Sequence, residues 1–400
     1  MASAATQSVL LSYCRTPFGR LGGVLKEMKA VDLGAIVIKE ALGRAHVSPT
    51  AVQHVIMGMV IQAGAGQIPS RQATLKAGLG REITSDTINR VCGSGMRAIT
   101  LADALIRAGE YEVIVAGGME SMSNTPFLLP GARFGFKVGD VTMRDAMQYD
   151  GLRWPTDGGG VLMGVQGDET AEEERVSREE QDAFALRSHR RAIAAIDRGV
   201  FAEEIVPVDV PGPKGASTMV DLDEAPRRET SAEALARLKP AFRPNGTVTA
   251  GNAPGVNDGA AAVVIASSAW AEAHGLKPLA RVVASATSAW DVPYLIYTPA
   301  MAAATALERA DLSVDDLDAV EINEAFASVP IVSGRRLGVD PENLNVNGGA
   351  IALGHPIGAS GTRITGTLAL HLRRHGGGLG LAAICSGGGQ GDAIILEVRA

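Results

Sequence analysis

Two kinds of apolar pattern alternate along most of the chain. Short apolar runs predict β-strands, and segments with an apolar residue every three or four positions predict amphipathic helices. The expected strands are residues 8–13, 52–60, 83–88, 111–116 and 379–384, and the expected helices are residues 32–44, 72–77 and 95–108. Strands and helices that alternate at these lengths are typical of parallel βαβ units. The pattern therefore predicts an α/β protein.

Parts of this pattern occur twice. ALGRAHVS at 41–48 resembles ALERADLS at 306–313, and SGMR at 94–97 resembles SGTR at 360–363 with nearly the same offset. A third pair, DGAAAVVI from residue 258 and GDAIIL from residue 391, has a much shorter offset. Two similar halves, the first interrupted by an insertion, would account for both offsets. The repeat predicts halves at residues 1–120 with 250–272 and at residues 273–400, with residues 121–249 inserted.

The insertion has a different composition from the halves. Residues 121–168 are rich in Gly, Pro and Met and are expected to be long ordered loops, as are the Pro-rich and charged residues 207–245. Between them, Ser177 and Glu180 have the spacing of a capping box and predict a helix that stops at Gly199. Its many charges are expected to form a solvated face. An insertion of loops over an α/β core usually shapes a ligand site.

Composition narrows the class of protein. A chain of 400 residues with 46% hydrophobic content can bury a large core and form two or three domains. The net charge of -7 provides no general basic field for nucleic acid, so an anionic substrate would need local cations. Three cysteines argue against a disulfide framework. With neither a signal peptide nor a long uncharged apolar run in the sequence, we expect a cytoplasmic protein without a membrane span.

Cys92 lies between a predicted strand and a predicted helix, in the stretch NRVCGSG at 89–95. A thiol at the first turn of a helix faces unpaired N–H groups, which would lower its pKa and make it a nucleophile. Gly93 and Gly95 would leave room for a ligand. The alternative is a small buried residue at a strand–helix junction, which is common for a free cysteine.

Four segments of the second half also lie at predicted strand ends or strand–helix junctions. They contain Asn323, the NGGA stretch at 347–350, His355 and Cys385 with the glycines at 387–389. Ligands gather beyond the carboxyl ends of strands in open α/β sheets, so one polar group from each segment would converge between the halves.

Taken singly, each residue also has a structural explanation. His355 could be a hydrogen-bonded turn residue, Cys385 a buried strand-end residue, and Asn323 the cap of a helix that begins at Glu324. The glycines from Gly387 could form a turn or a phosphate loop. Cys14, within a strand and without a polar neighbour, is expected to be structural.

Together these residues favour one type of reaction. A nucleophilic cysteine needs a base such as histidine, and a second thiol can give or take another proton. Asn323 and glycine N–H groups can form oxyanion holes. Two oxyanion holes and two proton-handling groups exceed what a hydrolase requires, and they suit an acyl-enzyme that makes or breaks a carbon–carbon bond. No Cys/His spacing fits zinc, and no dinucleotide fingerprint follows the first strand.

In order, the motifs NRVCGSG, GTVTAGNA, INEAF, NGGAIALGHPIGASG and CSGGGQGDA resemble those of the thiolase family, and the match spans essentially the whole chain. The resemblance implies the thiolase fold: two βαβαβαββ halves in five α/β/α/β/α layers with an inserted loop domain. It also implies a homotetramer built as a dimer of dimers, with no metal or redox cofactor.

The resemblance also implies roles. Cys92 would carry the acyl group, His355 would activate it, and Cys385 would move the proton on the α-carbon of the second acetyl-CoA. Asn323, through a water, and His355 would stabilise the enolate oxygen. The N–H groups of Cys92 and Gly387 would hold the tetrahedral oxyanion. The products would be acetoacetyl-CoA and CoA, with thiolysis in the reverse direction.

Coenzyme A contacts are implied in the same way. Arg227 would lie near the nucleotide end, and Met163, Ala325 and Phe326 would border the pantetheine and acyl channel, beside Ala253 and Pro254. Many members of the family have serine at the position of Pro254, and short-chain biosynthetic members often have histidine at that of Leu162. Both differences bear on the acyl-chain preference.

The first hypothesis is therefore an acetyl-CoA C-acetyltransferase. A degradative 3-ketoacyl-CoA thiolase for longer chains is the main alternative. A non-catalytic acyl-CoA-binding or scaffold protein would be expected to lack one of Cys92, His355 or Cys385, and all three are present. Decarboxylating condensing enzymes of related fold characteristically use Cys-His-His or Cys-His-Asn, so the CSGGGQG cysteine argues against that class.

Overall fold

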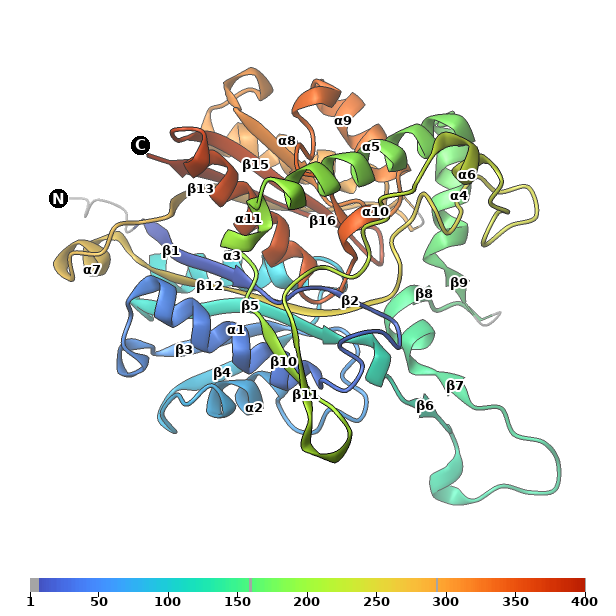
Figure 1. Ribbon diagram of the computed structural model, residues 1–400, viewed down its shortest axis with the longest axis horizontal. Coiled ribbons are helices and arrows are strands. Elements are labelled where there is room, and N and C mark those ends of the chain that lie inside the picture. Colours follow the sequence, from blue (N-terminus) through green and yellow to red (C-terminus); the bar gives the residue numbers. More distant parts are fainter. Residues whose placement is uncertain (1–6, 158–159, 293, 400) are drawn as a thin grey trace.

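The computed structural model describes residues 7–157, 160–292 and 294–399 (Figure 1). Its main sheet runs in the order β14-β15-β16-β13-β1-β12-β5-β3-β4, with β2 (Gly19–Arg20) paired to β12. These strands are β1 (Ser8–Arg15), β3 (His54–Gly58), β4 (Thr84–Ile88), β5 (Val113–Ser121), β12 (Asn257–Ser267), β13 (Ala280–Ala289), β14 (Ala319–Ile322), β15 (Gly378–Ser386) and β16 (Gln390–Val398).

The sheet repeats the same arrangement twice. In the first half β3 is parallel to β5, and β12 is antiparallel to both β5 and β1. In the second half β14 is parallel to β15, and β16 is antiparallel to both β15 and β13. A short antiparallel contact of β1 with β13 joins the halves. The predicted duplication is confirmed, and so are the parallel βαβ units, in β3–β5 and β14–β15. β16 is antiparallel to β15 because it follows β15 directly without a crossover helix.

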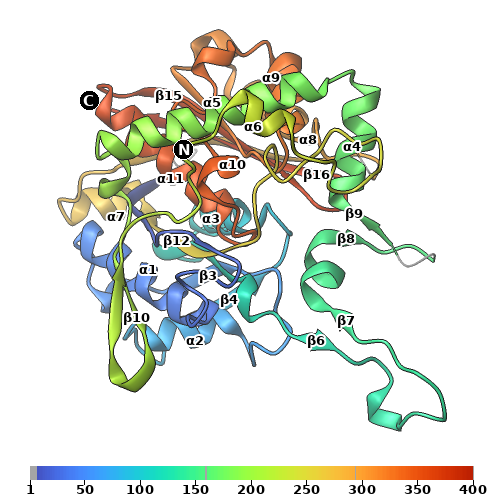
Figure 2. The ribbon, with the colours of Figure 1, turned by 45° about the vertical axis from the view of Figure 1, so that its right-hand side comes forward.

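Helices complete the five layers (Figures 1 and 2). The outer helices are α1 (Ala30–Ala45) and α2 (Pro69–Lys76) on the first half, and α8 (Thr298–Ala310) and α9 (Ser328–Leu337) on the second. Between the halves lie α3 (Ser94–Arg107) and α11 (Ser360–Arg374), whose apolar residues share one buried cluster with both parts of the sheet. They pack closely, since a Cβ atom on Gly361 would lie 2.4 Å from the Met96 nitrogen. This is the predicted thiolase arrangement.

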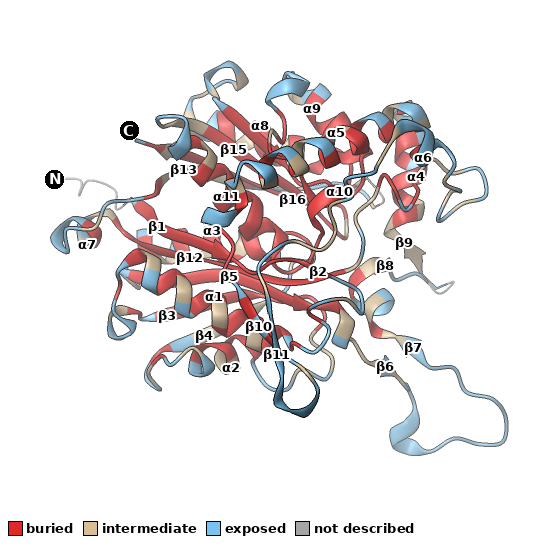
Figure 3. Cartoon of the chain, in the orientation of Figure 1, coloured by how far each residue is buried: buried red, intermediate tan, exposed pale blue. Residues whose placement is uncertain are grey.

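The sequence explains why these helices form and stop where they do. In α1 the residues Leu33, Val37, Ile38 and Ala41 are spaced to form one buried stripe, and the helix ends at His46, which adopts φ 53. Across the protein the strands of the main sheet and the central helices are buried, and the outward faces of the outer helices are exposed (Figure 3). Two further short helices are α7 (Ser268–Ala273) and α10 (Ala350–Leu353).

The inserted segment contains more regular structure than expected. Its elements are β6 (Phe127–Leu128), β7 (Arg144–Asp145), β8 (Arg153–Trp154), β9 (Val161–Leu162), α4 (Met163–Glu173), α5 (Arg178–Asp197), β10 (Val208–Pro211), β11 (Ser217–Val220) and α6 (Ala232–Ala236). The Ser177 side chain accepts a hydrogen bond from the Glu180 N–H, as predicted for the start of α5. The prediction of loops up to residue 168 is wrong from Met163 onward. The expected solvated face of α5 is only partly right, since Asp182 and Ser188 are buried polar residues.

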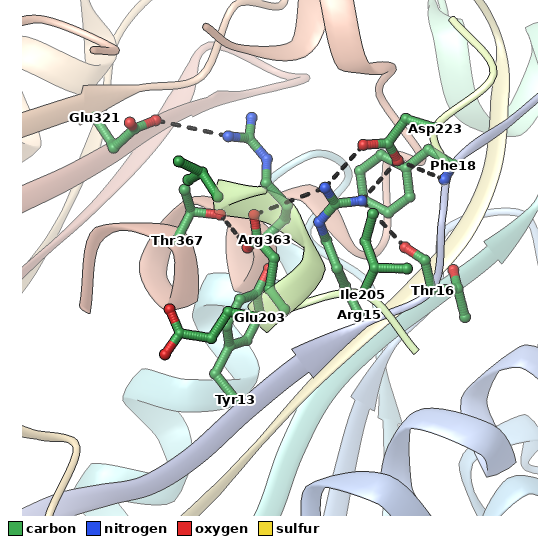
Figure 4. Close-up of polar contacts among 12 residues, drawn as sticks. Tyr13, Arg15, Thr16, Phe18, Glu203, Ile205, Asp223, Glu321, Arg363 and Thr367 are labelled. Carbon is green, nitrogen blue, oxygen red and sulfur yellow. Dashed lines mark hydrogen bonds and ion pairs between the residues drawn. The ribbon is translucent and has the colours of Figure 1, made fainter. Parts of the chain in front are cut away.

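Buried ion pairs and hydrogen bonds connect the inserted segment to both halves of the protein (Figure 4). The Arg15 guanidinium of β1 donates to both carboxylate oxygens of Asp223, at 2.6 and 2.8 Å. Glu204 lies 3.7 Å from Arg15 and accepts a 2.7 Å hydrogen bond from Thr367 of α11. Because breaking one member of a buried ion pair typically costs about 3–5 kcal/mol, the insertion is held firmly over the core. Within the described ranges, no helix is long and apolar enough to cross a bilayer.

Candidate active site

Cys92 lies in the loop between β4 and α3, two residues before the helix begins at Ser94. Its side chain is buried, and Val91 before it has φ 46, a left-handed conformation that is costly for a β-branched residue. Asn89 supports this turn: its Oδ1 accepts from the Val91 N–H at 2.9 Å, and its Nδ2 donates to the Val60 carbonyl at 3.2 Å. The two Asn89 hydrogen bonds therefore hold the loop in this conformation and fix the position of the Cys92 thiol.

The Cys92 thiol is not activated in the way the sequence suggested. Burial raises its pKa to about 12, although the backbone N–H groups of Cys92 and Gly387 act in the opposite direction. The expected lowering of the pKa by the helix N-terminus is wrong, because desolvation outweighs the local dipoles. Cys92 is therefore protonated at neutral pH and needs a base to become a nucleophile.

His355 has the properties of that base. Its side chain is buried, and burial together with the charge of Arg363 lowers its pKa to about 3, so the imidazole is neutral at physiological pH. Nδ1 lies 2.6 Å from Ser360 Oγ, which donates to the Pro356 carbonyl at 3.0 Å. Because the Ser360 hydroxyl hydrogen is donated to the Pro356 carbonyl, Ser360 Oγ accepts a hydrogen bond from His355 Nδ1–H. The proton of the neutral imidazole is therefore on Nδ1, and the lone pair of Nε2 is available. Within the described structure Nε2 has no hydrogen-bond partner.

The loop that carries His355 is fastened to the first half. The buried Glu120 carboxylate accepts hydrogen bonds from the N–H groups of Val60, Ile61 and Gly358, at 3.0, 3.1 and 3.0 Å. Burial raises the pKa of Glu120 to about 7, while these three N–H groups favour its charged form. Ile357 belongs to the same buried cluster as Cys92. Glu120 thus holds the histidine loop beside the start of α3.

Asn257 provides a second attachment for the same loop. The His355 N–H donates to Asn257 Oδ1 at 2.8 Å, and Asn257 Nδ2 donates to the Gly19 carbonyl at 2.9 Å. A residue of β12 in the first half therefore fixes the backbone of a catalytic candidate in the second.

Cys385 is the penultimate residue of β15 and is buried. Burial and the charge of Cys92 both raise its pKa, so the two thiols are close enough to influence each other. Gly387 follows in the turn to β16. A Cβ atom there would lie 2.4 Å from Met163 Cε and 3.2 Å from Val91 Cγ1, so a side chain at this position would displace Met163. The Gly387 N–H interacts with the Cys92 sulfur.

Asn323 follows directly after β14. Its side chain is buried, and neither its Oδ1 nor its Nδ2 has a partner among the described residues. The alternative role as a helix cap does not apply, because α9 begins only at Ser328. Its backbone N–H donates to the Ala383 carbonyl at 3.0 Å, which places it two residues along the neighbouring strand from Cys385. An unpartnered buried amide is expected to have a ligand or a water.

The acyl-channel candidates also gather together. Met163, Ala253, Ala325 and Phe326 contribute to one apolar cluster, which contains Cys385 as well. Met163 also lines an open cleft of about 910 Å³ together with Val91 and Gly387, which flank the two thiols. Neither thiol is part of its lining.

The remaining coenzyme A candidates are half-buried or exposed. Pro254 and Leu162 are half-buried, and Leu162 immediately precedes α4. Arg227 is exposed, and its backbone N–H donates to the buried His189 Nδ1 at 3.3 Å. No contact of the described structure ties Arg227 to the two thiols, so its expected role at the nucleotide end remains a prediction.

Sequence reasoning missed several supporting residues. Ser360 lies inside the GHPIGASG motif, five residues after His355, and a hydroxyl at that spacing was the available signal. Glu120 and Asn257 act on segments far away in the sequence, so no local spacing reveals them. Phe242 was also missed; it makes an edge-to-face contact with Phe326 at 6.5 Å.

A protonated thiol, a neutral histidine with a free Nε2, a second thiol and open N–H groups define a site for acyl transfer through a cysteine thioester. In the described chain no cluster of three or more His, Cys, Asp or Glu residues could hold a metal. Residues 8–269 match the thiolase N-terminal domain and residues 276–398 match the thiolase C-terminal domain. The chain belongs to the thiolase family.

Relatives of known name cover almost the whole chain. A probable acetyl-CoA acetyltransferase of Mycobacterium leprae is 51% identical over 98% of this chain and 99% of its own length. The acetyl-CoA acetyltransferase of Escherichia coli is 48% identical over 97% of this chain and 98% of its own, and that of Syntrophomonas wolfei is 47% identical over 97% and 98%.

Proposed function

We propose that the protein is an acetyl-CoA C-acetyltransferase, which condenses two acetyl-CoA molecules to acetoacetyl-CoA and CoA and catalyses thiolysis in reverse. The observation that carries this proposal is the pair of buried, mutually interacting thiols, Cys92 and Cys385, from the two halves. His355, whose Nε2 has no hydrogen-bond partner among the described residues, is the base proposed for them. The names of the relatives support it.

In the first step His355 Nε2 takes the Cys92 proton, and the thiolate attacks the thioester carbon. The N–H groups of Cys92 and Gly387 hold the oxyanion that forms. The carbon–sulfur bond to coenzyme A breaks, the leaving thiolate takes the proton back from His355, and acetyl-Cys92 remains. The neutral state of His355 suits this role, since a group already protonated cannot accept the thiol proton.

In the second step Cys385 gives its thiol proton to His355 and, as thiolate, removes a proton from the α-carbon of a second acetyl-CoA. Asn323, through a water, and His355 stabilise the enolate oxygen. The carbanion attacks the carbonyl of acetyl-Cys92, the new carbon–carbon bond forms, and the bond to Cys92 sulfur breaks. Protonated His355 returns its proton to the Cys92 thiolate, and Cys385 keeps the proton taken from the α-carbon. The unpartnered amide of Asn323 supports this assignment, because it can bind a water without breaking another contact.

Substrate binding follows from the acyl-channel cluster. Met163, Ala253, Ala325 and Phe326 would contact the pantetheine and acyl group, and Pro254 would contact it without the hydroxyl that serine provides elsewhere in the family. Arg227 would meet the anionic nucleotide end. The reaction consists of proton and acyl transfers without an oxidant or a reductant, so we propose that no metal or redox cofactor takes part and that chelators leave the rate unchanged. We further propose that the enzyme acts in the cytoplasm.

Assembly as a homotetramer is part of the proposal. The segment between β6 and β7 extends away from the body of the molecule (Figure 2). It exposes Phe127, Phe134, Val138 and Met143, of which Phe134 is 92% accessible. Large apolar side chains grouped in this way are usually covered by a partner, and a second copy of this chain is the partner proposed here.

The function is tested by incubating the purified protein with acetyl-CoA and following acetoacetyl-CoA by chromatography, with thiolysis of acetoacetyl-CoA measured beside longer 3-ketoacyl-CoAs. Turnover of the short substrate at least as fast as the longer ones is expected. A large preference for longer chains would instead identify a degradative 3-ketoacyl-CoA thiolase, and binding without any turnover would identify a non-catalytic acyl-CoA-binding protein.

A further inference from the structure

A largely buried ion pair connects the loop that carries Cys92 with the hairpin that carries Cys385. Arg90 Nε lies 2.9 Å from Asp392 Oδ2, and the Asp392 side chain is fully buried while that of Arg90 is 23% exposed. Asp392 faces Ile384 in the β15–β16 ladder, directly beside the paired residues Cys385 and Gly391. The ion pair therefore connects the residue two positions before Cys92 with the residue beside the strand partner of Cys385.

A second contact acts in parallel with this pair. Ser386, the residue after Cys385, donates its hydroxyl hydrogen bond to the Arg90 carbonyl. Arg90 is thus bound to the hairpin through both its side chain and its backbone. Burial raises the pKa of Asp392 to about 6, while the nearby charges of Arg90 and Arg97 oppose that rise.

The position of the carboxylate also constrains the residue after Cys92. A Cβ atom on Gly93 would lie 2.5 Å from Asp392 Oδ2, so the carboxylate rests directly against that glycine. Asp392 consequently fixes the loop on both sides of Cys92. Between these fixed points Val91 adopts its left-handed conformation, and such a conformation persists only where the surrounding contacts enforce it.

We propose that Arg90 and Asp392 form a positioning pair that sets the placement of Cys92 relative to Cys385 for the carbon–carbon bond-forming step. This inference rests on the proposed function. The contacts that place the His355 loop beside the first half run instead through Glu120 and Asn257. The placement of His355 therefore has its own supports. The placement of the Cys92 loop against the hairpin that carries Cys385 depends instead on the Arg90–Asp392 pair, and acylation is affected by it only through the Gly387 N–H of the oxyanion hole.

The different dependence of acylation and condensation on this pair is tested with three variants: Arg90→Gln, Asp392→Asn and the double variant. Formation of acetyl-Cys92 is followed by rapid quench and mass spectrometry, and acetoacetyl-CoA formation is followed in the steady state. We expect acylation slower by no more than about fivefold, since only the Gly387 donor of the oxyanion hole moves with the hairpin, and condensation slower by on the order of 10- to 100-fold, the scale of a small misplacement of reacting groups. The double variant should be no slower than the slower single variant, since both remove one interaction. Arg90→Lys, which keeps the charge, should recover part of the loss.

Glu397→Gln is the matched control, because it breaks the partly exposed Arg281–Glu397 pair on the same strand β16 and should preserve both rates. Thermal unfolding shows whether each variant is folded. If Asp392→Asn does not fold, the test is made with Arg90→Gln, because Arg90 is at the partly exposed end of the pair. Equal losses in acylation and condensation, additive losses in the double variant, or unchanged condensation would each overturn the positioning role. Failure of wild type to acylate would instead overturn the proposed function itself.

Discussion

Ser360→Ala is expected to slow the acylation of Cys92 while leaving substrate binding intact. In the folded protein the Ser360 hydroxyl donates to the Pro356 carbonyl and accepts from His355 Nδ1–H, which reserves Nε2 for the thiol proton. Removing the hydroxyl leaves a buried N–H without a partner, at a cost of about 1–3 kcal/mol. The imidazole then favours the other tautomer, whose Nε2 is protonated and cannot act as a base.

The size of the effect follows from that cost. Since about 1.4 kcal/mol corresponds to a tenfold change in rate, the acylation rate constant should fall roughly 5- to 150-fold. Rapid quench of enzyme mixed with acetyl-CoA, with the acetyl adduct measured by mass, gives this constant directly.

The control removes a different hydroxyl from the same buried helix. Thr365 donates to the Gly361 carbonyl at 2.7 Å and does not contact His355, so Thr365→Val should acylate at nearly the wild-type rate. The reasoning about the tautomer would be refuted by a Ser360→Ala variant that is folded and acylates within twofold of wild type, or by one in which only KM changes.

Three other predictions concern separate parts of the account. Cys385→Ala should still form acetyl-Cys92 but fail to condense, and full synthesis activity in this variant would contradict a proton-transfer role for Cys385. The pKa of His355 is lowered from 6.5 to about 3 in the folded protein, so the unfolded chain binds more protons between these values and the free energy of unfolding falls on acidification. His355→Gln should reduce that slope by up to about 1.4 kcal/mol per pH unit in denaturant titrations, and an unchanged slope would argue against a buried neutral imidazole. Phe134→Asp combined with Val138→Asp should give a smaller assembly by light scattering, whereas an unchanged mass would show that these exposed residues do not hold copies together.

The elements of the two halves were predictable because the helices have a periodic apolar stripe and the strands are continuous apolar runs. The stripe of α1 and the fully buried strands leave clear patterns, and the repeat preserved enough residues to indicate the duplication. The direction of the antiparallel strands was not predictable, since periodicity does not encode which neighbour a strand pairs with. The helix α4 was hidden by Gly164 and Gly167, glycines that allow Phe242 and Phe326 to pack closely against it.

Some residues of the candidate site could likewise be predicted from the sequence, and others could not. Cys92, His355, Cys385 and Asn323 were found because strand ends converge in this kind of fold and their motifs are specific. The state of Cys92 was predicted wrongly, because its desolvation depends on packing from both halves and not on its own helix. Glu120 was missed because its partner Gly358 is distant in the sequence.

The central claim is that Cys92 carries the acyl group and Cys385 does not. Brief exposure of the wild-type protein to acetyl-CoA, followed by acid quench and peptide mass mapping, tests it most directly. The account predicts an acetyl adduct on Cys92 alone. An adduct on Cys385, or no adduct while the protein turns over, would contradict it.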